Sequence, residues 1–266
     1  MFTIKNYVVA KDLEEAYILN QKKNNVVLGG IAWLKMGERN IQNAIDLSGL
    51  GLDIIEETKD SFKIGCMVTL RELETNPNIN SYYNGAIAKS LKHIVGVQFR
   101  NCATVGGSIF SRFGFSDLLT CLLALDSYVE LYKGGIVPLS EFVNMPRDND
   151  LLINVLIRKD TREVSYLTHR RSATDIPVLA CAVTYTNDKW QVVLGARPKK
   201  AKLILDREHL LSQNPTEKEI DKFIEYMKEN TSFGSNMRAS ADFRRHLAGV
   251  LCKRGMEEIT ERKGLK

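Results

Sequence analysis

Hydrophobic residues along the chain follow two spacings, one of three to four residues and one of two, which predict a mixture of helices and strands. Asp12 precedes apolar residues at helical spacing, so a short helix capped by its side chain is expected. The apolar run 26–28 predicts a strand, which Gly29 and Gly30 end abruptly. Further expected elements are strands at 62–65 and 128–132, short helices at 69–74 and 85–94, and a helix beginning at Ser116 or Asp117.

The apolar run 151–157 gives way to polar residues at 158–160, and this change of composition predicts a domain boundary. We place one domain at residues 1–160 and a second at residues 161–266. The second domain is expected to be small and mixed. Its strand-like runs lie at 178–185 and 190–194.

Two amphipathic helices are expected near the end of the second domain. One begins at Thr216, where Glu219 completes a capping box, and the other begins at about Ser240. The residues expected to face inward are Ile220, Phe223, Ile224 and Met227 in the first helix, and Phe243, Leu247, Val250 and Leu251 in the second.

The composition is that of an ordinary globular protein, with 44% hydrophobic and 26% charged residues. A length of 266 residues accommodates two domains, each with its own hydrophobic core. No run approaches the roughly eighteen apolar residues that span a bilayer, and the first residues lack a basic region followed by an apolar stretch. We therefore expect a cytoplasmic protein without a membrane span.

Cysteine spacing and charge exclude several kinds of site. No two of the five cysteines lie within four residues of each other, so neither a CxxC metal pair nor an iron–sulfur cluster is expected. Their odd number fits a reducing compartment. The net charge of +5 comes mostly from local clusters such as 197–200, without a ribonucleoprotein motif or zinc-finger spacing, so no nucleic-acid partner is expected.

Two loops with paired glycines carry the clearest candidate chemistry: VVLGGIAWL at 26–34 and ATVGGSIFSRFGFSD at 103–117. Because glycine lacks a Cβ, we expect positive φ at these glycines and bare amide groups that approach an anion closely. Successive inward-pointing amides form a nest that suits a pyrophosphate, and Thr104 and Ser108 add hydroxyl donors. A single glycine pair often only reverses the chain. Neither loop matches the Rossmann or P-loop pattern, so another architecture would hold a nucleotide.

Four segments in order resemble the FAD-binding subunit of the xanthine dehydrogenase and carbon monoxide dehydrogenase group of molybdenum hydroxylases. The first glycine loop resembles the AGGTDLL loop of that family. The segment 99–131 resembles its RN-x-AT-x-GGN, SP-x-x-D and LLALDA motifs. The segment 169–183 is similar to RR-x-A-x-DI, and 238–258 is similar to the closing RASAEYRR helix. The resemblance covers essentially the whole chain.

This resemblance implies an α+β fold in which an FAD-binding domain of the PCMH or vanillyl-alcohol-oxidase type precedes a smaller α+β domain with a three-stranded sheet and helices. It also implies one FAD, which we expect to be bound non-covalently because none of the four histidines lies in a glycine loop. The implied partners are a large subunit with molybdopterin and a small subunit with 2Fe-2S clusters, and those two cofactors are expected only there. NAD or another acceptor would receive the electrons.

The resemblance also implies a binding site. Asp117 matches the aspartate that reaches the adenosine side of FAD, although it also reads as a plain helix cap. Ile94 and Leu152 match positions that line the isoalloxazine. No catalytic acid, base or nucleophile stands out, which fits a subunit whose redox chemistry belongs to its cofactor. The implied diphosphate contacts are Leu28, Gly29, Gly30, Ile31, Ala32 and Trp33 from the first loop, and Thr104, Val105, Gly106, Gly107 and Ser108 from the second.

The sequence departs from the family pattern in two places. Ile31 and Ala32 stand where Thr and Asp are usual, so backbone amides would hold more of the phosphate. Leu167 stands where some members have a lysine near the pyrimidine edge of the flavin, which puts nicotinamide reactivity in doubt. Trp33 packs either against the cofactor or in the core. The alternative sources of positive charge are His169, Arg170 and Arg171, which also read as exposed surface residues.

Two other functions stay open at this point. A stand-alone flavin oxidoreductase of the same fold would need a general base near the flavin, and the sequence offers no convincing one. A flavin-free scaffold subunit would keep the fold without the cofactor, as the side chains of Ile31 and Ala32 allow. A visible absorption spectrum separates the scaffold from the flavoproteins.

Overall fold

The computed structural model describes residues 2–264 and contains two compact units, each built from segments that are distant in the sequence. The outermost residues of the two predicted domains, 1 and 265–266, lie outside the described part of the chain. The predicted boundary at residue 160 stays a prediction. The first unit comprises Met1–Leu73, Gly96–Ser111 and Ser127–Arg158, and the second comprises Glu74–Val95, Arg112–Asp126 and Lys159–Lys266.

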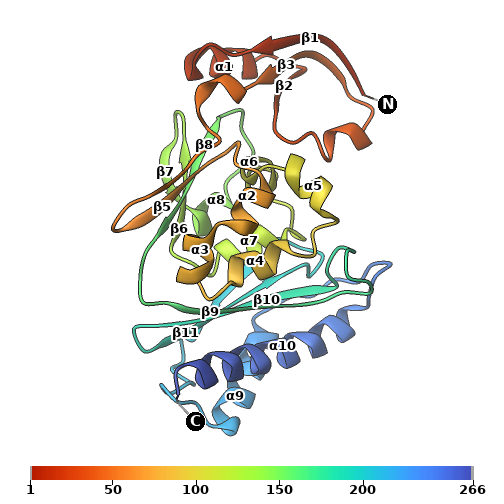
Figure 1. Cartoon of the computed structure of the whole chain (residues 1–266). Coiled ribbons are helices and arrows are strands. Elements are labelled where there is room, and N and C mark those ends of the chain that lie inside the picture. Colours follow the sequence, from red (N-terminus) through yellow and green to blue (C-terminus); the bar gives the residue numbers. More distant parts are fainter. Residues whose placement is uncertain (1, 265–266) are drawn as a thin grey trace. The chain divides into compact units, whose positions relative to one another are not determined.

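A three-stranded parallel sheet opens the first unit (Figure 1). Its strands are β1 (Thr3–Val9), β2 (Asn25–Leu28) and β3 (Asn40–Asp46), in the order β1-β3-β2. Parallel strands need a crossover connection, which α1 (Leu13–Asn20) supplies between β1 and β2. The Asp12 side chain accepts a hydrogen bond from the Glu15 amide, which confirms the predicted cap. Two short 3-10 helices follow, η1 (Leu34–Met36) and η2 (Ser48–Leu50).

An antiparallel sheet of five strands completes the first unit, in the order β4-β5-β8-β6-β7. The predicted strands at 62–65 and 128–132 are confirmed within it as β5 and β6. The strands are β4 (Ile55–Glu57), β5 (Ser61–Gly65), β6 (Ser127–Leu131), β7 (Gly135–Pro138) and β8 (Leu152–Arg158). The helices of this part are α2 (Leu70–Thr75), α5 (Val97–Cys102), α6 (Val105–Phe110) and α8 (Leu139–Phe142).

The second unit is built on an antiparallel sheet in the order β12-β11-β10-β9, with one short strand, β12, more than the three expected. Every residue of β10 is buried, because both faces of this strand are covered. Its odd-numbered residues join the core formed with α9 and α10, whereas α7 packs against β10 and β11. The strands are β9 (Glu163–His169), β10 (Leu179–Thr186), β11 (Lys189–Gly195) and β12 (Lys202–Leu205); the helices are α3 (Pro77–Tyr82), α4 (Ala86–Leu91), α7 (Asp117–Leu122), α9 (Glu217–Glu229) and α10 (Ala241–Arg262).

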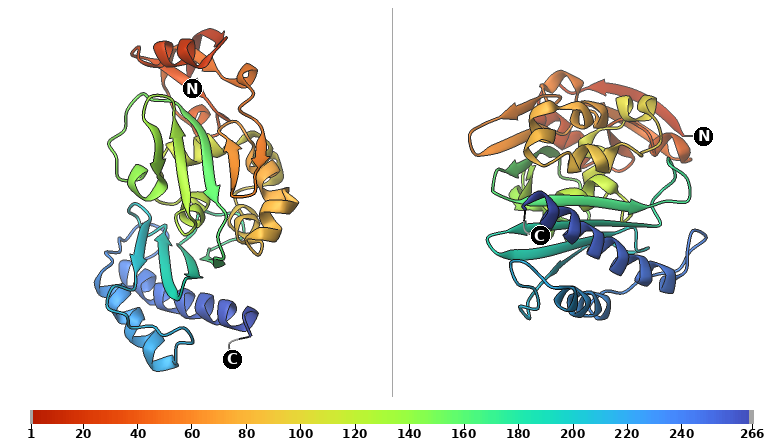
Figure 2. Two further views of the ribbon diagram at one scale, coloured as in Figure 1. Left: turned by 90° about the vertical axis from the view of Figure 1, so that its left-hand side faces the viewer. Right: turned by 60° about the horizontal axis from the view of Figure 1, so that its bottom comes forward.

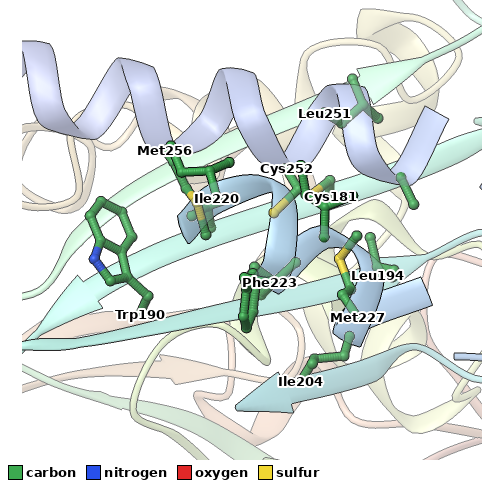
Figure 3. Packing of buried hydrophobic residues seen from close by; sticks show 14 of the residues in the cluster. Cys181, Trp190, Leu194, Ile204, Ile220, Phe223, Met227, Leu251, Cys252 and Met256 are labelled. Carbon is green, nitrogen blue, oxygen red and sulfur yellow. The ribbon is translucent and has the colours of Figure 1, made fainter. Parts of the chain in front are cut away.

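The core of the second unit lies between the sheet and the two long helices (Figures 2 and 3). The capping box of Thr216 and Glu219 is confirmed, and so is the cap at Ser240. All four residues expected to face inward from α9 are buried. In α10 the prediction is wrong for Phe243, which lies in the first turn and is 43% exposed. Its ring meets the His169 ring edge-on.

Candidate functional site

The first glycine loop begins where the parallel sheet of the first unit ends. Leu28, the last residue of β2, is buried and lies opposite Asp46, the last residue of β3. Val9, at the end of β1, lies opposite the same Asp46. The carboxyl ends of all three strands therefore meet at one edge, and in open sheets with parallel strands this edge is where ligands bind.

The expected positive φ at the paired glycines is wrong. Among the described glycines with positive φ, none is Gly29, Gly30, Gly106 or Gly107. The residue with positive φ in the first loop is instead Ile31, at 53°. A β-branched residue rarely adopts this conformation, because its Cβ crowds the backbone.

Close packing is what requires the glycines of the first loop. A Cβ on Gly29 would lie 2.7 Å from the Oγ1 of Thr104, and a Cβ on Gly30 would lie 1.9 Å from the carbonyl oxygen of Cys102. Real Cβ atoms do not approach other atoms so closely. The two glycine loops therefore lie directly against each other within the first unit.

The second glycine pair lies inside a helix and not in the open loop expected from the sequence. Thr104 caps α6, and a Cβ on Gly106 would lie 2.7 Å from the carbonyl oxygen of Cys66. The first amides of α6 all have acceptors within the first unit, so they do not form the expected bare nest. These hydrogen bonds run from the amides of Val105 to Val68 O (2.9 Å), Gly106 to Cys66 O (2.8 Å), Gly107 to Thr104 Oγ1 (3.2 Å) and Ser108 to Thr104 O (3.1 Å).

One face of α6 stays accessible beside the first loop. Gly107 is exposed, and Ser108 and Ser111 are half-buried one turn apart. The Ser108 hydroxyl donates to the carbonyl oxygen of Thr104 at 2.9 Å. Ser111 is not among the site residues predicted from the sequence. Its spacing from Ser108 places both side chains on one face of a helix, but this stretch was predicted to be a loop.

The first loop offers the backbone donors that the second lacks. Within residues 2–264, no group accepts a hydrogen bond from the amides of Gly29, Gly30, Ile31 or Ala32. Ile31 is 39% exposed and Trp33 is 53% exposed, so Trp33 is not an ordinary core indole. The first loop contains no carboxylate. Unbonded amides beside hydroxyl groups, without negative charge, fit the diphosphate of a dinucleotide.

Asp117 lies in the second unit, where it is the first residue of α7 and Ser116 supplies the cap. Its carboxylate is buried, forms an ion pair with Arg170 and accepts a hydrogen bond from the Tyr166 hydroxyl at 2.8 Å. Burial raises the pKa of Asp117, while Arg170 and Tyr166 act in the opposite direction. The side chain therefore has a structural role, and its predicted contact with adenosine remains a prediction.

The possible sources of positive charge near a flavin differ in their surroundings. Arg170 donates to the Asp117 carboxylate and to the carbonyl oxygen of Asp175, so its charge is already paired. Arg171 is exposed. Leu167 lies in β9 opposite Cys181, where it packs against the hydrophobic core of the second unit.

The two residues predicted to line the isoalloxazine belong to different units. Ile94 follows α4 in the second unit and is half-buried. Leu152 begins β8 in the first unit and is 6% exposed. Their contact with a flavin stays a prediction.

No metal centre accompanies the glycine loops in the part of the chain that the structure describes, since it contains no group of three or more His, Cys, Asp or Glu side chains placed to hold an ion. Four of the cysteines are buried, and burial raises the pKa of Cys66, Cys121 and Cys252 to about 12. Cys102 is exposed. Across residues 2–264, every helix is too short or too polar to cross a membrane.

The glycine loop at the end of a parallel sheet, with its unbonded amides, defines a protein of the dinucleotide-binding class. Residues 2–159 match the family described as the FAD-binding domain in molybdopterin dehydrogenase. Residues 165–259 match the C-terminal domain of the CO dehydrogenase flavoprotein. The chain therefore belongs to the FAD-binding flavoprotein family of the molybdopterin dehydrogenases.

Two individual proteins are similar to this chain over most of its length. The chain is 28% identical over 210 residues to the uncharacterized protein YgfM of Escherichia coli K12, covering 78% of this chain and 76% of the relative. It is 24% identical over 245 residues to the xanthine dehydrogenase FAD-binding subunit of Escherichia coli O157:H7, covering 85% and 82%.

Solved structures show the same fold. A chain of the carbon monoxide dehydrogenase from Hydrogenophaga pseudoflava superposes with a TM-score of 0.85 at 20% identity, covering 97% of each chain. A chain of quinoline 2-oxidoreductase from Pseudomonas putida 86 superposes with a TM-score of 0.83 at 17% identity, covering 96% of each chain. The α+β fold class expected from the sequence is confirmed.

Proposed function

We propose that this chain binds one FAD non-covalently and relays electrons as a subunit of a molybdenum hydroxylase. The observation that carries this proposal is the first glycine loop, whose amides at 29–32 have no acceptor among the described residues. The family match supports FAD as the ligand. The relative named as a xanthine dehydrogenase FAD-binding subunit supports a place in a complex of several subunits.

The residues that would hold FAD divide by the part of the cofactor they meet. The amides at 29–32 and the hydroxyls of Thr104 and Ser108 would bind the diphosphate, and the exposed ring of Trp33 would cover an aromatic part of the cofactor. In the proposal, Ile94 and Leu152 line the isoalloxazine, and Asp117 lies toward the adenosine. FAD supplies the one- and two-electron chemistry that none of these side chains offers.

The remaining components of the proposed complex follow from the family. A large subunit would carry molybdopterin and oxidise the substrate, and a small subunit would carry the 2Fe-2S clusters. NAD or another acceptor would take the electrons from this chain. We place this assembly in the cytoplasm, with an FAD-binding domain at residues 1–160 and a C-terminal domain at 161–266.

Purification from the native source tests the complex. Mild isolation should recover this chain with one larger and one smaller partner subunit. Metal analysis should find molybdenum and iron in the preparation. The isolated chain should show no flavin reduction by purines or related heterocycles, because it has no evident general base. Reduction of its flavin by substrate without any partner would instead identify a stand-alone oxidoreductase.

A further inference from the structure

The outer strand β1 leaves one edge of the three-stranded parallel sheet open (Figure 1). In the described part of the chain β1 pairs with β3 alone, and the Thr3 amide donates to the carbonyl oxygen of Arg39 at 3.0 Å. The odd-numbered residues of β1 therefore direct their backbone groups toward β3, because successive residues of a strand face opposite edges. The N–H and C=O groups of Ile4, Asn6 and Val8 point to the open edge, where a further strand can pair with them.

This edge lacks the features by which proteins usually keep other chains from adding to a sheet. Typical protections are proline, bulges and charged side chains. The strand β1 has no proline, keeps one register with β3 and carries a single charge, on Lys5. Six of its seven residues are exposed, among them Ile4 (38%), Tyr7 (60%) and Val9 (54%). The edge is therefore accessible and partly apolar.

A row of three asparagines crosses the same sheet and ends at this edge. The buried Asn25 in β2 donates to the carbonyl oxygen of Leu19 at 2.7 Å. Asn43 in β3 donates to Asn25 at 2.9 Å, and Asn6 in β1 donates to Asn43 at 3.1 Å. Within residues 2–264, no group donates to the Oδ1 atom of Asn6. The row therefore stops at an unused acceptor on the exposed strand, and asparagine rows of this kind stabilise the pairing of further strands.

We infer that β1 is an interaction edge for a second copy of this chain, whose own β1 adds in the antiparallel direction about a two-fold axis at Asn6. In this arrangement the two Asn6 residues lie opposite each other and exchange both backbone hydrogen bonds. Ile4 of each copy lies opposite Val8 of the other and does the same, because the backbone groups of these residues face outward. The Oδ1 atom of each Asn6 meets the second side-chain N–H of the other, so the asparagine row continues through both copies.

The charge of β1 favours a second copy as the occupant of this edge. Like charges directly opposite each other destabilise an antiparallel pair. With the axis at Asn6, Lys5 of one copy lies opposite Tyr7 of the other, so the ammonium meets an exposed aromatic ring and not a second ammonium. The only charge of the strand therefore supports self-pairing. This pairing does not involve FAD, so its test is independent of the proposed function.

Sedimentation velocity of the full chain over a series of concentrations tests the association. The wild type should change reversibly from monomer to dimer as the concentration rises. A chain that stays monomeric up to about 100 μM would overturn the inference and leave the edge to a strand of a different partner. Asn6→Lys and Asn6→Asp each place two like charges opposite each other at the axis, so each should raise the dimer dissociation constant by about tenfold or more. An equimolar mixture of the two variants should dimerise again, because the opposed charges then attract each other.

Ile136→Lys provides the matched control for these variants. Ile136 is 61% exposed in β7, at the outer edge of the other sheet of the first unit, so this variant should dimerise like the wild type. Loss of association in Ile136→Lys, or an Asn6→Lys chain that dimerises as tightly as the wild type, would place the interface elsewhere and overturn the inference.

Hydrogen–deuterium exchange on the wild type decides the matter if the variants do not fold. Dimerisation at high concentration should slow exchange at the amides of Ile4, Asn6 and Val8, which face the open edge. The amides of Lys5 and Tyr7 should exchange at unchanged rates, because they already face β3. Exchange at Ile4, Asn6 and Val8 that is equal at low and high concentration would contradict the pairing.

Discussion

The contact between the two glycine loops makes a quantitative prediction about Gly29. In Gly29→Ala the new methyl group would lie 2.7 Å from the Oγ1 of Thr104. That oxygen must then rotate away and lose the cap of α6, or the loops must separate. Overpacking of this kind costs about 1–3 kcal/mol, so we expect Gly29→Ala to lower the free energy of unfolding by about 2 kcal/mol.

Removal of the clashing atom should abolish the penalty of the new methyl group and leave only the cost of the lost cap. Thr104→Ala deletes Oγ1 and the cap, at a cost of about 1 kcal/mol. If the clash with Oγ1 is the whole effect, the double variant Gly29→Ala/Thr104→Ala should cost only about 1 kcal/mol as well. The coupling energy between the two positions would then be about 2 kcal/mol, well outside the additivity expected of independent sites.

Gly30 provides the matched control for this cycle. A methyl group there would lie 1.9 Å from the backbone carbonyl of Cys102, which no side-chain deletion can move. Gly30→Ala combined with Thr104→Ala should therefore be additive. Urea unfolding of the flavin-free protein, followed by circular dichroism, measures all the variants. Additive costs for Gly29→Ala and Thr104→Ala would refute the proposed contact between the loops.

Three further predictions concern the second unit. Asp117→Asn should destabilise the protein by about 3–5 kcal/mol in urea unfolding, because it leaves Arg170 buried without its partner; a loss below about 1 kcal/mol would show that the ion pair is not structural. Arg244, which is 1% exposed, donates to three carbonyl groups and one side-chain amide, so Arg244→Lys should lower stability by about 3 kcal/mol or more; a thermal melt like that of the wild type would contradict this. The hydrogen bond from Arg238 lowers the pKa of Asp175, so this carboxylate stabilises the fold above its unfolded pKa of about 3.9, and the contribution disappears as the pH falls through the folded value. Asp175→Asn should therefore cost up to about 1 kcal/mol at pH 7 and progressively less as the pH falls below about 3.9, and a cost that does not decline with falling pH would exclude the ionic contribution.

The parts of the fold that the sequence predicted are those with local signals. Asp12, Thr216 and Ser240 each cap a helix as expected, because a cap depends on residues within one turn. The buried strand β10 was recognisable from its continuous apolar composition. By contrast, β1 was missed because its residues are almost all exposed and show no alternation of buried and exposed positions.

The local geometry of the site was not predictable in the same way. Two consecutive glycines lower helix propensity, so the sequence favoured a loop where α6 forms. The close approach of Gly106 to Cys66 is a tertiary contact that the local sequence does not encode. The sequence also did not indicate that the positive φ of the first loop lies at Ile31, because this residue type disfavours it and the neighbouring glycines tolerate it. The sequence therefore indicated which two loops lie together, but not the backbone conformation of either loop.

The visible absorption spectrum of the purified chain, read before and after acid precipitation, tests FAD binding most directly. We expect a yellow protein with the two-banded flavin spectrum and one FAD per chain, and this FAD should pass entirely into the supernatant when the protein is denatured. A colourless chain that takes up no FAD on titration would identify the flavin-free scaffold instead. Flavin that stays with the precipitated polypeptide would contradict non-covalent binding.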